Sequence, residues 1–543
     1  MHRTLTRTIR PAIASLLLAP IVPLLSLAQS SPTGAPAGAA AVEQRAFGTA
    51  PPARLVASFD GLGVGFRGPQ GEATLRNPSD NSLAVGRDHI VQTVNSRMAI
   101  FTKRGTTFRS TGEVLYGPVP THNMFRGFGG PCEERNNGDA VVRYDQLADR
   151  WLLVMPIFSR VAPRTSTPGP RRAALVAPAP SAAAAAPSPS PSASPPPATG
   201  GYAMCYAISA GPDPLGSWDR YEFARPLFPD YPRPAVWPDG YYVPTSTGDE
   251  VVEKHVCVVD RVRMLAGQDA TEQCIIVKDV NFLNTADLDG RMLPPAGAPN
   301  IVLAAGGTQL RGEFEADAIF AWRFFVDWTD PARTRLEGPQ RIAVAPYRYL
   351  CGGQLTTCVP QPGTDRRLDA QGDKLMARMV YRRFATHEAL VAVHSVNTMA
   401  LGGGVRWYEL RLDQAGAPVL HQQGTFAPDG DFRWMASPAI DAYGNIGIGY
   451  SFGGERHFPG QRFVGRTARD PLGSLPFAER VLVEGEAAQT TTLRWQDYTQ
   501  TALDPVDDCT VWYVGDYLKR GAASYSTRIG AFRMPGCPTE GEP

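Results

Sequence analysis

The chain lacks the short motifs that mark several common enzyme classes. It contains no G-x-S-x-G nucleophile motif, no glycine-rich loop leading from a strand into a helix, and no H-E-x-x-H zinc motif. No stretch gathers five or six like charges, and 53 Lys and Arg stand against 52 Asp and Glu. Hydrolase-fold, nucleotide-binding and zinc-protease chemistry is therefore not indicated, and neither nucleic acid nor an anionic membrane is an expected partner.

The chain also lacks C-x-x-C pairs, although it has eight cysteines. An even set without such pairs disfavours a zinc ribbon or a thioredoxin-like site, and it favours disulfides formed in an oxidising compartment. We expect cysteines that are neighbours along the chain to pair, while other connectivities stay open. The expected pairs are Cys132 with Cys205, Cys257 with Cys274, Cys351 with Cys358, and Cys509 with Cys537.

Long apolar runs are missing except at the amino terminus. Arg3, Arg7 and Arg10 precede an apolar run over residues 12–27, and Ser26-Leu27-Ala28 offers the small residues of a cleavage site. This pattern predicts a signal peptide over residues 1–28. No cysteine follows the cleavage point for a lipid anchor, and no later segment has the roughly 18 apolar residues of a membrane span. We expect a secreted or periplasmic monomer.

Helical periodicity is almost absent, and short apolar strands recur in its place. Seven units of similar plan begin near Asp80, Asp139, Tyr231, Asn300, Asp373, Arg433 and Asp497. An internal echo, Asp213-Pro214-Leu215-Gly216-Ser217 against residues 470–474, falls between the third and fourth strands of two units, and Asp330-Pro331 holds the same place in another. The repetition predicts an all-β fold, a single β-propeller of seven four-stranded blades over residues 53–538, with six blades as the alternative.

Segments of low complexity flank and interrupt this repeat. Residues 29–52 are rich in Ala, Pro and Gly, and we expect a disordered leader there. The strand that follows, residues 54–59, is expected to pair with the last blade and close the ring. Residues 159–200 are rich in Pro, Ala and Ser, which predicts a disordered insert within the second blade. Residues 539–543 are expected to form a flexible tail.

Four stretches of the carboxyl-terminal part carry a resemblance to a known group. These are residues 432–435, 441–446, 494–498 and 504–513. With them the chain, from about Asn81 to Cys537, resembles secreted bacterial propeller proteins related to the sialidase-like superfamily, a group without an assigned activity. The resemblance implies the fold and export. The chain departs from true sialidases because it lacks their recurrent Ser-x-Asp-x-Gly-x-x-Trp turn.

The inner strands of a propeller start near its axis, so residues at the unit openings are the candidate site. They are Asn81, Asp139, Tyr231, Arg233, Asp373, Arg433, Trp434, Asp497 and Tyr498, with Arg494 and Trp495 beside them. Three chemistries suit these residue types. Arg233, Arg433 and Arg494 would clamp a carboxylate as in sialidases, with Tyr498 as nucleophile. Asp139, Asp373 and Asp497 would supply paired carboxylates for glycoside hydrolysis. Trp434, Trp495 and Tyr498 would form platforms for a sugar or a peptide.

A structural role is the alternative for each of these residues. Asp and Arg at blade openings commonly bond backbone groups and one another around the channel. Four tryptophans in mid-strand are expected to pack between blades, namely Trp151, Trp237, Trp407 and Trp512.

Taken together, the patterns predict an exported propeller that binds an extracellular or cell-envelope ligand, a glycan, in an axial pocket. The alternatives are a sialidase-like glycoside hydrolase or polysaccharide lyase, and a structural or adhesion protein without catalysis. No cofactor is expected. The acidic turns at residues 287–290 and 504–508 would suit structural calcium, with solvated turns as the alternative.

Overall fold

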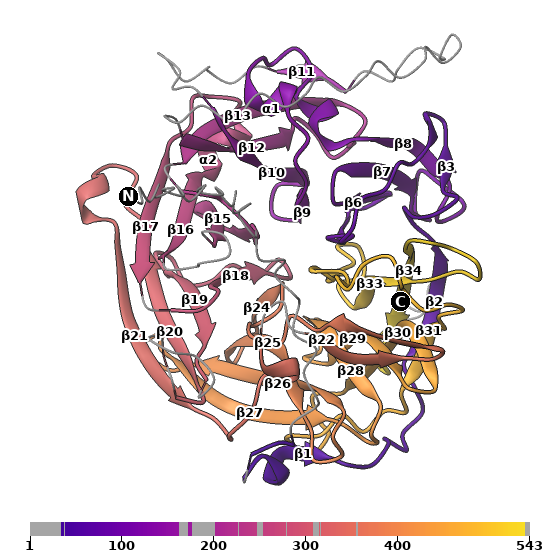
Figure 1. The fold of residues 1–543 in the computed structure, drawn as a ribbon. Helices are drawn as coiled ribbons and strands as arrows, with labels where there is room; N and C mark the ends of the chain where they lie inside the picture. The colour runs from indigo at the N-terminus through magenta and orange to yellow at the C-terminus, as the bar shows by residue number, and fades with distance from the viewer. Residues whose placement is uncertain are drawn as a thin grey trace, which may run out of the picture.

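The sheets of this all-β protein are arranged around a central axis, as in a propeller (Figure 1). The computed structural model describes residues 34–36, 38–161, 172–175, 201–225, 227–246, 253–278, 280–307, 314, 316–353 and 357–537. The predicted signal peptide and the tail at 539–543 lie outside these residues. Among them, no helix has the length and apolar character needed to cross a bilayer.

Four of the sheets stand apart as blades, each an antiparallel run of four main strands. The first contains β5 (Ser82–Val85), β6 (His89–Val94), β7 (Arg97–Thr102) and β8 (Val114–Pro120). The second contains β9 (Val141–Asp145), β10 (Arg150–Val161), β12 (Gly201–Ser209) and β13 (Ser217–Arg225), with the short β11 (Ala173–Ala174) at its edge. The third contains β14 (Ala235–Trp237), β15 (Gly240–Thr245), β16 (Glu253–Asp260) and β17 (Glu272–Lys278). The last contains β32 (Gln500–Leu503), β33 (Thr510–Tyr517), β34 (Ser526–Arg533) and β2 (Arg54–Asp60).

The remaining main strands form one 13-stranded sheet, so the prediction of seven separate blades is wrong at the level of hydrogen bonding. Three antiparallel runs follow one another within it. They are β18 (Asn284–Leu288), β19 (Asn300–Ala305), β20 (Ala318–Phe325) and β21 (Arg335–Ala343); β24 (Met379–Arg383), β25 (Glu388–Asn397), β26 (Gly403–Leu412) and β27 (Pro418–Phe426); and β28 (Phe432–Ile440), β29 (Ile446–Gly454), β30 (His457–Arg466) and β31 (Arg480–Val483).

Parallel pairing between neighbouring runs joins them into this one sheet. β18 pairs with β24 from Ala286 to Leu288, and β26 meets β28 at Gly403 and Phe432. A side chain at Gly403 would crowd this contact, because a Cβ there would lie 2.8 Å from the Leu350 side chain and 3.1 Å from the Phe432 ring. Close approach of these backbones, which the repeat pattern does not reveal, merges the runs.

The fourth unit begins earlier than the sequence predicts. Its inner strand is β18, whereas the predicted opening residue, Asn300, starts the second strand and is fully buried. The Asn300 amide exchanges hydrogen bonds with the backbone of Ala286 at 2.8 and 3.1 Å. The sequence of β18, Asn-Thr-Ala-Asp-Leu, has no apolar run, and this is why it escapes a search for strands.

The echoed Asp-Pro turns lie between third and fourth strands, as predicted, at β12–β13, β20–β21 and β30–β31. Their aspartates bond backbone amides. Asp213 accepts from the Leu215 amide at 2.9 Å, and Asp330 accepts from the Ala332 amide at 3.2 Å. The repeat thus reflects a turn requirement, because a short carboxylate satisfies amides that the strands leave unpaired.

The predicted amino-terminal strand pairs with the last sheet. β2 is antiparallel to β34, and Figure 1 shows the indigo strand beside the yellow end of the chain. The described part of the leader is ordered, contrary to the prediction for residues 29–52. It forms a 3-10 turn, η1 (Ala39–Val42), and β1 (Glu43–Gln44), which pairs with β27. The Gln44 side chain then bonds the backbone of Leu475 at 2.8 and 3.1 Å, so specific contacts outweigh the composition.

The expected insert is only partly described. Residues 159–161 continue β10, and residues 172–175 lie against β13, where Ala173 pairs with Trp218. Arg172 makes a bidentate ion pair with Asp219 at 2.6 and 2.9 Å. Disorder is therefore the wrong prediction for residues 172–175, and the rest of the insert lies outside the described residues.

Smaller elements complete the structure. They are β3 (Arg67–Gly68) with β4 (Gly71–Glu72), β22 (Thr357–Gln361) with β23 (Thr364–Asp369), the helices α1 (Pro131–Glu134) and α2 (Arg261–Leu265), and the 3-10 turns η2 (Thr121–Phe125), η3 (Pro331–Arg333) and η4 (Leu350–Gly352). All four predicted disulfides are confirmed.

Apolar cores fill the spaces between neighbouring sheets. Trp151 packs between the first and second sheets, Trp237 lies in the core that joins the third sheet to the β18 and β24 runs, and Trp512 lies between the last sheet and the first. Trp407 belongs to the core shared by the β24 and β28 runs. All four are buried, as predicted for packing residues. Burial of large apolar surface between blades is what holds the ring together.

Candidate functional site

The unit openings meet at one end of the axis, which we call the mouth. Asp80, Asp139, Tyr231 and Asp497 each precede an inner strand with a left-handed backbone, at φ of 49°, 53°, 54° and 65°. Asp tolerates this conformation better than most residues, so part of the aspartate repeat is a backbone requirement. The Tyr231 hydroxyl donates to the Asp497 carbonyl at 2.6 Å, and the Tyr498 hydroxyl donates to Asp139 at 3.5 Å. The openings of the second, third and last sheets therefore converge as predicted.

An apolar plug closes the axis directly below these residues. Tyr231 and Tyr498 stack with ring centres 4.2 Å apart, and Phe282 contacts Tyr231 edge-on. Two buried cations lie over these rings, the Arg233 guanidinium at 4.2 Å from Tyr231 and the Lys374 ammonium at 4.0 Å from Phe282. Cation–π contact partly compensates these charges for burial. A ligand at the mouth would thus contact carboxyls lying on a closed aromatic floor.

Crowding of carboxyls at the mouth favours their protonated forms. Burial and the carboxyls of Asp139 and Asp497 raise the pKa of Asp80 well above its usual value. Burial, with Asp230 and Asp497 nearby, does the same to the pKa of Asp139. Burial and Asp497 also raise the pKa of Asp230. The Asp497 carboxyl is bound by Arg494, and Gln371 donates to it at 3.1 Å. Carboxyls with a raised pKa therefore lie beside a carboxyl that a guanidinium binds.

Three parts of this group retain some exposure. Asp139 and Asp230 are half-buried, and the Arg494 side chain is 34% exposed. Asp80, Gln371 and Lys374 are buried beneath them. Several buried polar atoms at the mouth have no hydrogen-bond partner, namely Asp80 Oδ1, Asp373 Oδ1, Arg494 Nε, and the Nε and Nη2 atoms of Arg233. Contact with a ligand at this end would be made by Asp139, Asp230 and Arg494.

Sequence reasoning missed several residues of the mouth, namely Asp230, Asp369, Gln371 and Lys374. Asp230 directly precedes Tyr231, and Lys374 directly follows Asp373, so adjacency to predicted openings was the available signal. Asp369 and Gln371 follow the β22–β23 hairpin, which the repeat does not predict. Burial first, and Asp497 second, raises the pKa of Asp369 to about 7.

Asn81 and Asp373 are turned to internal partners. The Asn81 amide donates to Ser79 at 3.0 Å and to Asp516, and it accepts from Gln92 at 3.3 Å. Asp373 pairs with Lys374 at 3.4 Å and is 6% exposed. The polar groups of both residues are directed to partners inside the protein, so neither side chain is directed to solvent at the mouth.

The three predicted arginines do not form one clamp. Arg433 is buried between Asp429 and Glu479, each of which binds its guanidinium at 2.7 Å. Arg233 donates to the Leu283 carbonyl at 2.9 Å, whereas Arg494 binds Asp497. The carboxylate clamp is therefore a wrong prediction, because separate partners hold each guanidinium.

The predicted aromatic platforms and nucleophile are also unavailable at the surface. Trp434 and Trp495 are both 0% exposed and pack together with ring centres 6.1 Å apart. Tyr498 is 2% exposed, and burial together with Asp139 raises the pKa of its phenol well above the usual value. A phenol in this setting stays neutral, which is the opposite of what a tyrosine nucleophile needs.

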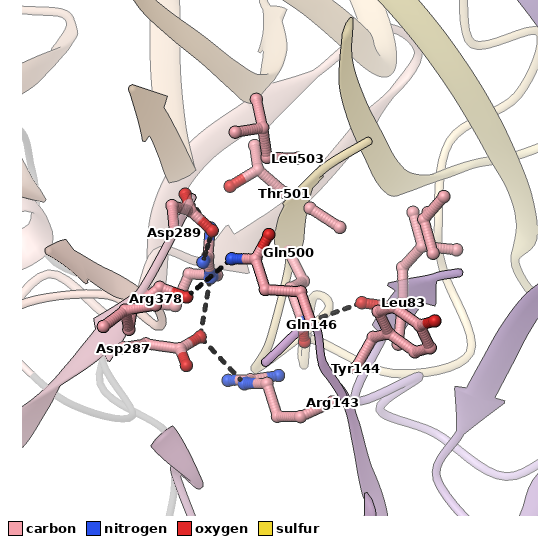
Figure 2. A pocket seen from close by; sticks show the side chains of 14 residues that line it. Leu83, Arg143, Tyr144, Gln146, Asp287, Asp289, Arg378, Gln500, Thr501 and Leu503 are labelled. Atoms are coloured by element: carbon pink, nitrogen blue, oxygen red, sulfur yellow. Dashed lines mark hydrogen bonds and ion pairs between the residues drawn. The ribbon is translucent and has the colours of Figure 1, made fainter. Parts of the chain in front are cut away.

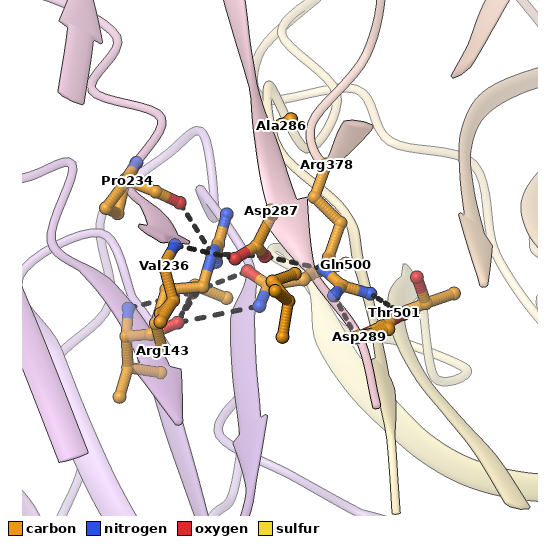
Figure 3. Close-up of polar contacts among 12 residues, drawn as sticks. Arg143, Pro234, Val236, Ala286, Asp287, Asp289, Arg378, Gln500 and Thr501 are labelled. Carbon is orange, nitrogen blue, oxygen red and sulfur yellow. Dashed lines mark hydrogen bonds and ion pairs between the residues drawn. The ribbon is translucent and has the colours of Figure 1, made fainter. Parts of the chain in front are cut away.

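Farther along the axis, a charged network spans the inner strands. Arg143 of β9 and Arg378, just before β24, both bind Asp287 of β18, at 3.3 and 2.8 Å (Figure 3). Arg378 also forms a bidentate pair with Asp289. The other Asp287 oxygen accepts from the Val236 amide at 2.9 Å. The network ties the inner strands of the second and third sheets to the β18 and β24 runs.

The cavity beside this network is too small for a sugar. It has a volume of about 30 Å³ and is lined by these side chains, by Gln500 of β32 and by the inner backbone (Figure 2). That space holds a water molecule or two, whereas ligand pockets measure roughly 300–1,000 Å³. The predicted ligand pocket is therefore not inside the channel at this level.

The acidic segments considered for calcium are occupied by cations of the protein. Asp287 and Asp289 bind Arg143 and Arg378, and Asp287 and Leu288 end β18 where a turn was expected. In the second segment, Asp504 pairs with Lys103, Asp507 with Arg533, and Asp508 with Arg382. Guanidinium and ammonium groups thus already neutralise the carboxylates that calcium would require.

Comparisons with known proteins add little to this geometry. No family model matches the chain, and no curated protein matches it. A protein of unknown function from Dyadobacter fermentans is 10% identical with a TM-score of 0.33, covering 89% of this chain and 100% of its own. An ulvan lyase is 11% identical with a TM-score of 0.38, covering 88% and 95%. An α-L-arabinofuranosidase from Fusarium graminearum is 8% identical with a TM-score of 0.28, covering 85% and 95%. Likenesses this weak carry no argument about activity, and the fold description rests on the sheets themselves.

Proposed function

We propose that the chain is a seven-bladed propeller that binds an extracellular glycan at the mouth of its axis. The blade count treats the three antiparallel runs of the 13-stranded sheet as three blades merged by parallel contacts. Four separate sheets and three merged runs then make seven units of four strands. The proposal includes a kinship with sialidase-like propellers in architecture only, because the arginine clamp of sialidases is not formed.

Export is part of the proposal. The sequence of residues 1–28 has the pattern of a signal peptide, and four disulfides are typical of proteins that fold in an oxidising compartment. The mature chain would begin at Gln29 and act as a monomer in the periplasm or the medium. The proposed role needs no cofactor.

One observation carries the proposed binding: Asp139 and Asp230, which keep some exposure, lie beside the Arg494–Asp497 ion pair. Carboxyls whose pKa is raised by burial and like charge both donate and accept hydrogen bonds, and Arg494 adds further donors. Vicinal hydroxyls of a sugar present the complementary donors and acceptors. The closed floor beneath the carboxyls limits a ligand to shallow contact, which suits recognition of a chain end or a surface.

A second candidate, glycoside hydrolysis, is favoured by the contrast between two carboxyls. Burial and its neighbours raise the pKa of Asp139, so this carboxyl would serve as the general acid. Asp497, bonded to Arg494 and Gln371, would serve as base or nucleophile. A lyase would use the same pair, with Arg494 bound to a uronic carboxylate. Asp373 has no part in this scheme because it pairs with Lys374.

Titration of the mature protein with neutral polysaccharides tests the binding proposal. Dextran, xylan and laminarin would be titrated by calorimetry, with Asp139→Asn and Asp230→Asn as the variants at the mouth. The exposed Asp365→Asn in β23 serves as the matched control. We expect the mouth variants to weaken binding about tenfold, equivalent to one lost strong hydrogen bond, and the control to bind like the native protein. Absence of binding to every chain, or equal loss in the control, would reject the proposal.

Hydrolysis is tested separately on the same polysaccharides and on aryl glycosides by measuring reducing ends. If the native protein is active and Asp139→Asn and Asp497→Asn abolish activity while Asp365→Asn keeps it, the mouth is catalytic. Binding without turnover would leave the protein a glycan-binding propeller.

A further inference from the structure

A large cavity lies at the opposite end of the blades from the mouth. It is open to solvent and measures about 700 Å³, within the range of ligand pockets. Its walls are the β5–β6 and β7–β8 turns of the first sheet, and the β32–β33 turn, the start of β2 and the end of β34 in the last sheet. We call it the junction groove, because it follows the place where the ring closes.

Positive side chains predominate in the junction groove. Five cations line it, namely Arg54, Arg87, Lys103, Arg104 and Arg533, against the three carboxylates Asp88, Asp504 and Asp507. Two of the three carboxylates are already neutralised inside the groove, Asp504 by Lys103 at 3.0 Å and Asp507 by Arg533 at 2.9 Å. Asp88 receives hydrogen bonds from Thr106 and the Thr107 amide. The excess positive charge therefore lies on the exposed arginines.

Two of these arginines are placed to receive an anionic ligand. Arg54 is exposed at the start of β2 and has no ion-pair partner among the described residues. Arg87 is 46% exposed and pairs with Asp149 of the second sheet, outside the groove, at 3.1 Å. They come from the two sheets that flank the groove, so a ligand between them would be held from both sides.

The groove also offers apolar surface. Val56 and Val506 line it and are 40% and 63% exposed, whereas Trp512 is buried at its base with its indole NH bonded to Asp504 at 3.1 Å. Guanidinium groups beside exposed aliphatic side chains match a sugar acid, which has an anionic group and an apolar ring face. A simple inorganic anion would leave this apolar surface unused.

A second cavity adjoins the junction groove at Arg87, which lines both. It measures about 530 Å³, and its charged lining residues are Arg87, Asp149, Arg261 and Arg291. Arg87 pairs with Asp149 and Arg261 with Asp145, whereas the exposed Arg291 has no ion-pair partner among the described residues. A groove that continues from Arg54 past Arg87 to Arg291 suits a linear ligand with repeated negative charges more than a single small molecule.

We infer that the junction groove binds an acidic polysaccharide, through carboxylate or sulfate groups held by Arg54 and Arg87 with sugar rings against the exposed Val56 and Val506. This site is independent of the mouth: it lies on another face, uses cations where the mouth uses carboxyls, and takes charged chains. Nucleic acid is the less suitable polyanion, because the net charge is only +1 and no basic run exists.

Calorimetric titration of the mature protein with polygalacturonate, dextran sulfate and neutral dextran tests this inference. The two acidic chains separate carboxylate from sulfate as the recognised group. The test variant is the double substitution Arg54→Glu with Arg87→Glu, and the matched control is Arg366→Glu, an exposed arginine of β23. Far-ultraviolet circular dichroism and the melting temperature check that each variant is folded.

We expect at least one acidic chain to bind, the double variant to weaken it tenfold or more, and the control to change affinity less than twofold. Affinity should fall as salt rises, because exposed ion pairs are screened. The mouth variant Asp139→Asn should leave this binding unchanged, so failure of the mouth and failure of the groove are distinguishable. The inference is overturned if neither acidic chain binds, if the control loses as much as the double variant, or if polyglutamate binds as tightly as the polysaccharides. If the double variant is unfolded, Arg54→Gln with Arg87→Gln replaces it and the same criteria apply.

Discussion

Asp516 offers the sharpest test of the electrostatics at the mouth, because the free-energy cost of burying a charge there comes from a single carboxyl. It lies in β33, is 2% exposed, and accepts a hydrogen bond from Asn81. Burial raises its pKa from 3.8 to about 7, and Asp497 adds to the effect, while Ser79 and Asn81 oppose it. Replacing Asp516 with Asn keeps the shape and the acceptor for Asn81, and it removes the charge.

The size of the effect follows from linkage. A folded pKa raised above the unfolded value means that the stabilising contribution of this group is fully present below about pH 4, the unfolded pKa, and is lost as the pH rises to about 7. The shift of about 3 units corresponds to about 4 kcal/mol at 1.36 kcal/mol per unit. We therefore expect Asp516→Asn to unfold like the native protein at pH 4 and to be more stable by about 2–4 kcal/mol at pH 8.

Urea unfolding followed by tryptophan fluorescence at both pH values measures this difference. Asp365→Asn, an exposed aspartate of β23, is the control and should show no such pH dependence. A gain of equal size at pH 4 and pH 8 would refute the reasoning, because a contact effect does not depend on ionisation. A loss of stability at pH 8 would show that the carboxylate is stabilised by partners that outweigh its burial.

Three further predictions concern contacts that hold the blades: an ion-pair network, a disulfide and the amino-terminal strand. Arg378→Leu should destabilise the protein by about 3–5 kcal/mol in urea unfolding, because it leaves buried Asp287 of β18 and buried Asp289 just after it without their main partner. An unchanged urea midpoint would contradict a stabilising role of the axial network. Replacing Cys132 and Cys205 with Ser opens a bridge between residues 73 apart and should cost about 4 kcal/mol relative to the native protein in urea unfolding; equal stability of the two would contradict this prediction. A mature chain that starts at Gly61 lacks β2 and exposes the edge of β34, so light scattering should detect aggregation that a chain starting at Ala53 does not show; equal solubility of the two would argue against edge protection.

The predicted mouth was found in part because one physical requirement shows in the sequence. A left-handed backbone before an inner strand favours Asp, and this gave Asp80, Asp139 and Asp497 a recurrent place that a sequence search detects. Tyr231 was found from the Pro-x-x-Trp-Pro-Asp-Gly strand that follows it. Asp369 and Gln371 were missed because the β22–β23 hairpin that brings them to the axis has no counterpart in the other units.

Burial explains the predicted site residues that failed. Arg433, Trp434 and Trp495 occupy the same kind of position as the successful residues, at or just before an inner strand. Nothing in their sequence tells whether a side chain turns toward the axis or into the core between two runs. Arg433 forms ion pairs with Asp429 and Glu479, and the two tryptophans pack against one another, through contacts that exist only in the folded chain.

The sequence by itself determined the strand repeat, the turn residues, the four disulfide pairs and the packing role of the mid-strand tryptophans. These properties depend on local backbone preferences, on residue type and on proximity along the chain, and all are legible without coordinates. Only the tertiary structure decided that three runs share one sheet, that the leader packs against β27, that the axis is closed by an aromatic plug and an arginine–aspartate network, and that a cationic groove follows the seam between the first and last sheets. Each of these results from contacts between different runs or sheets, such as Glu43 with Thr425 and Ala286 with Met379, and their geometry depends on how closely neighbouring backbones approach.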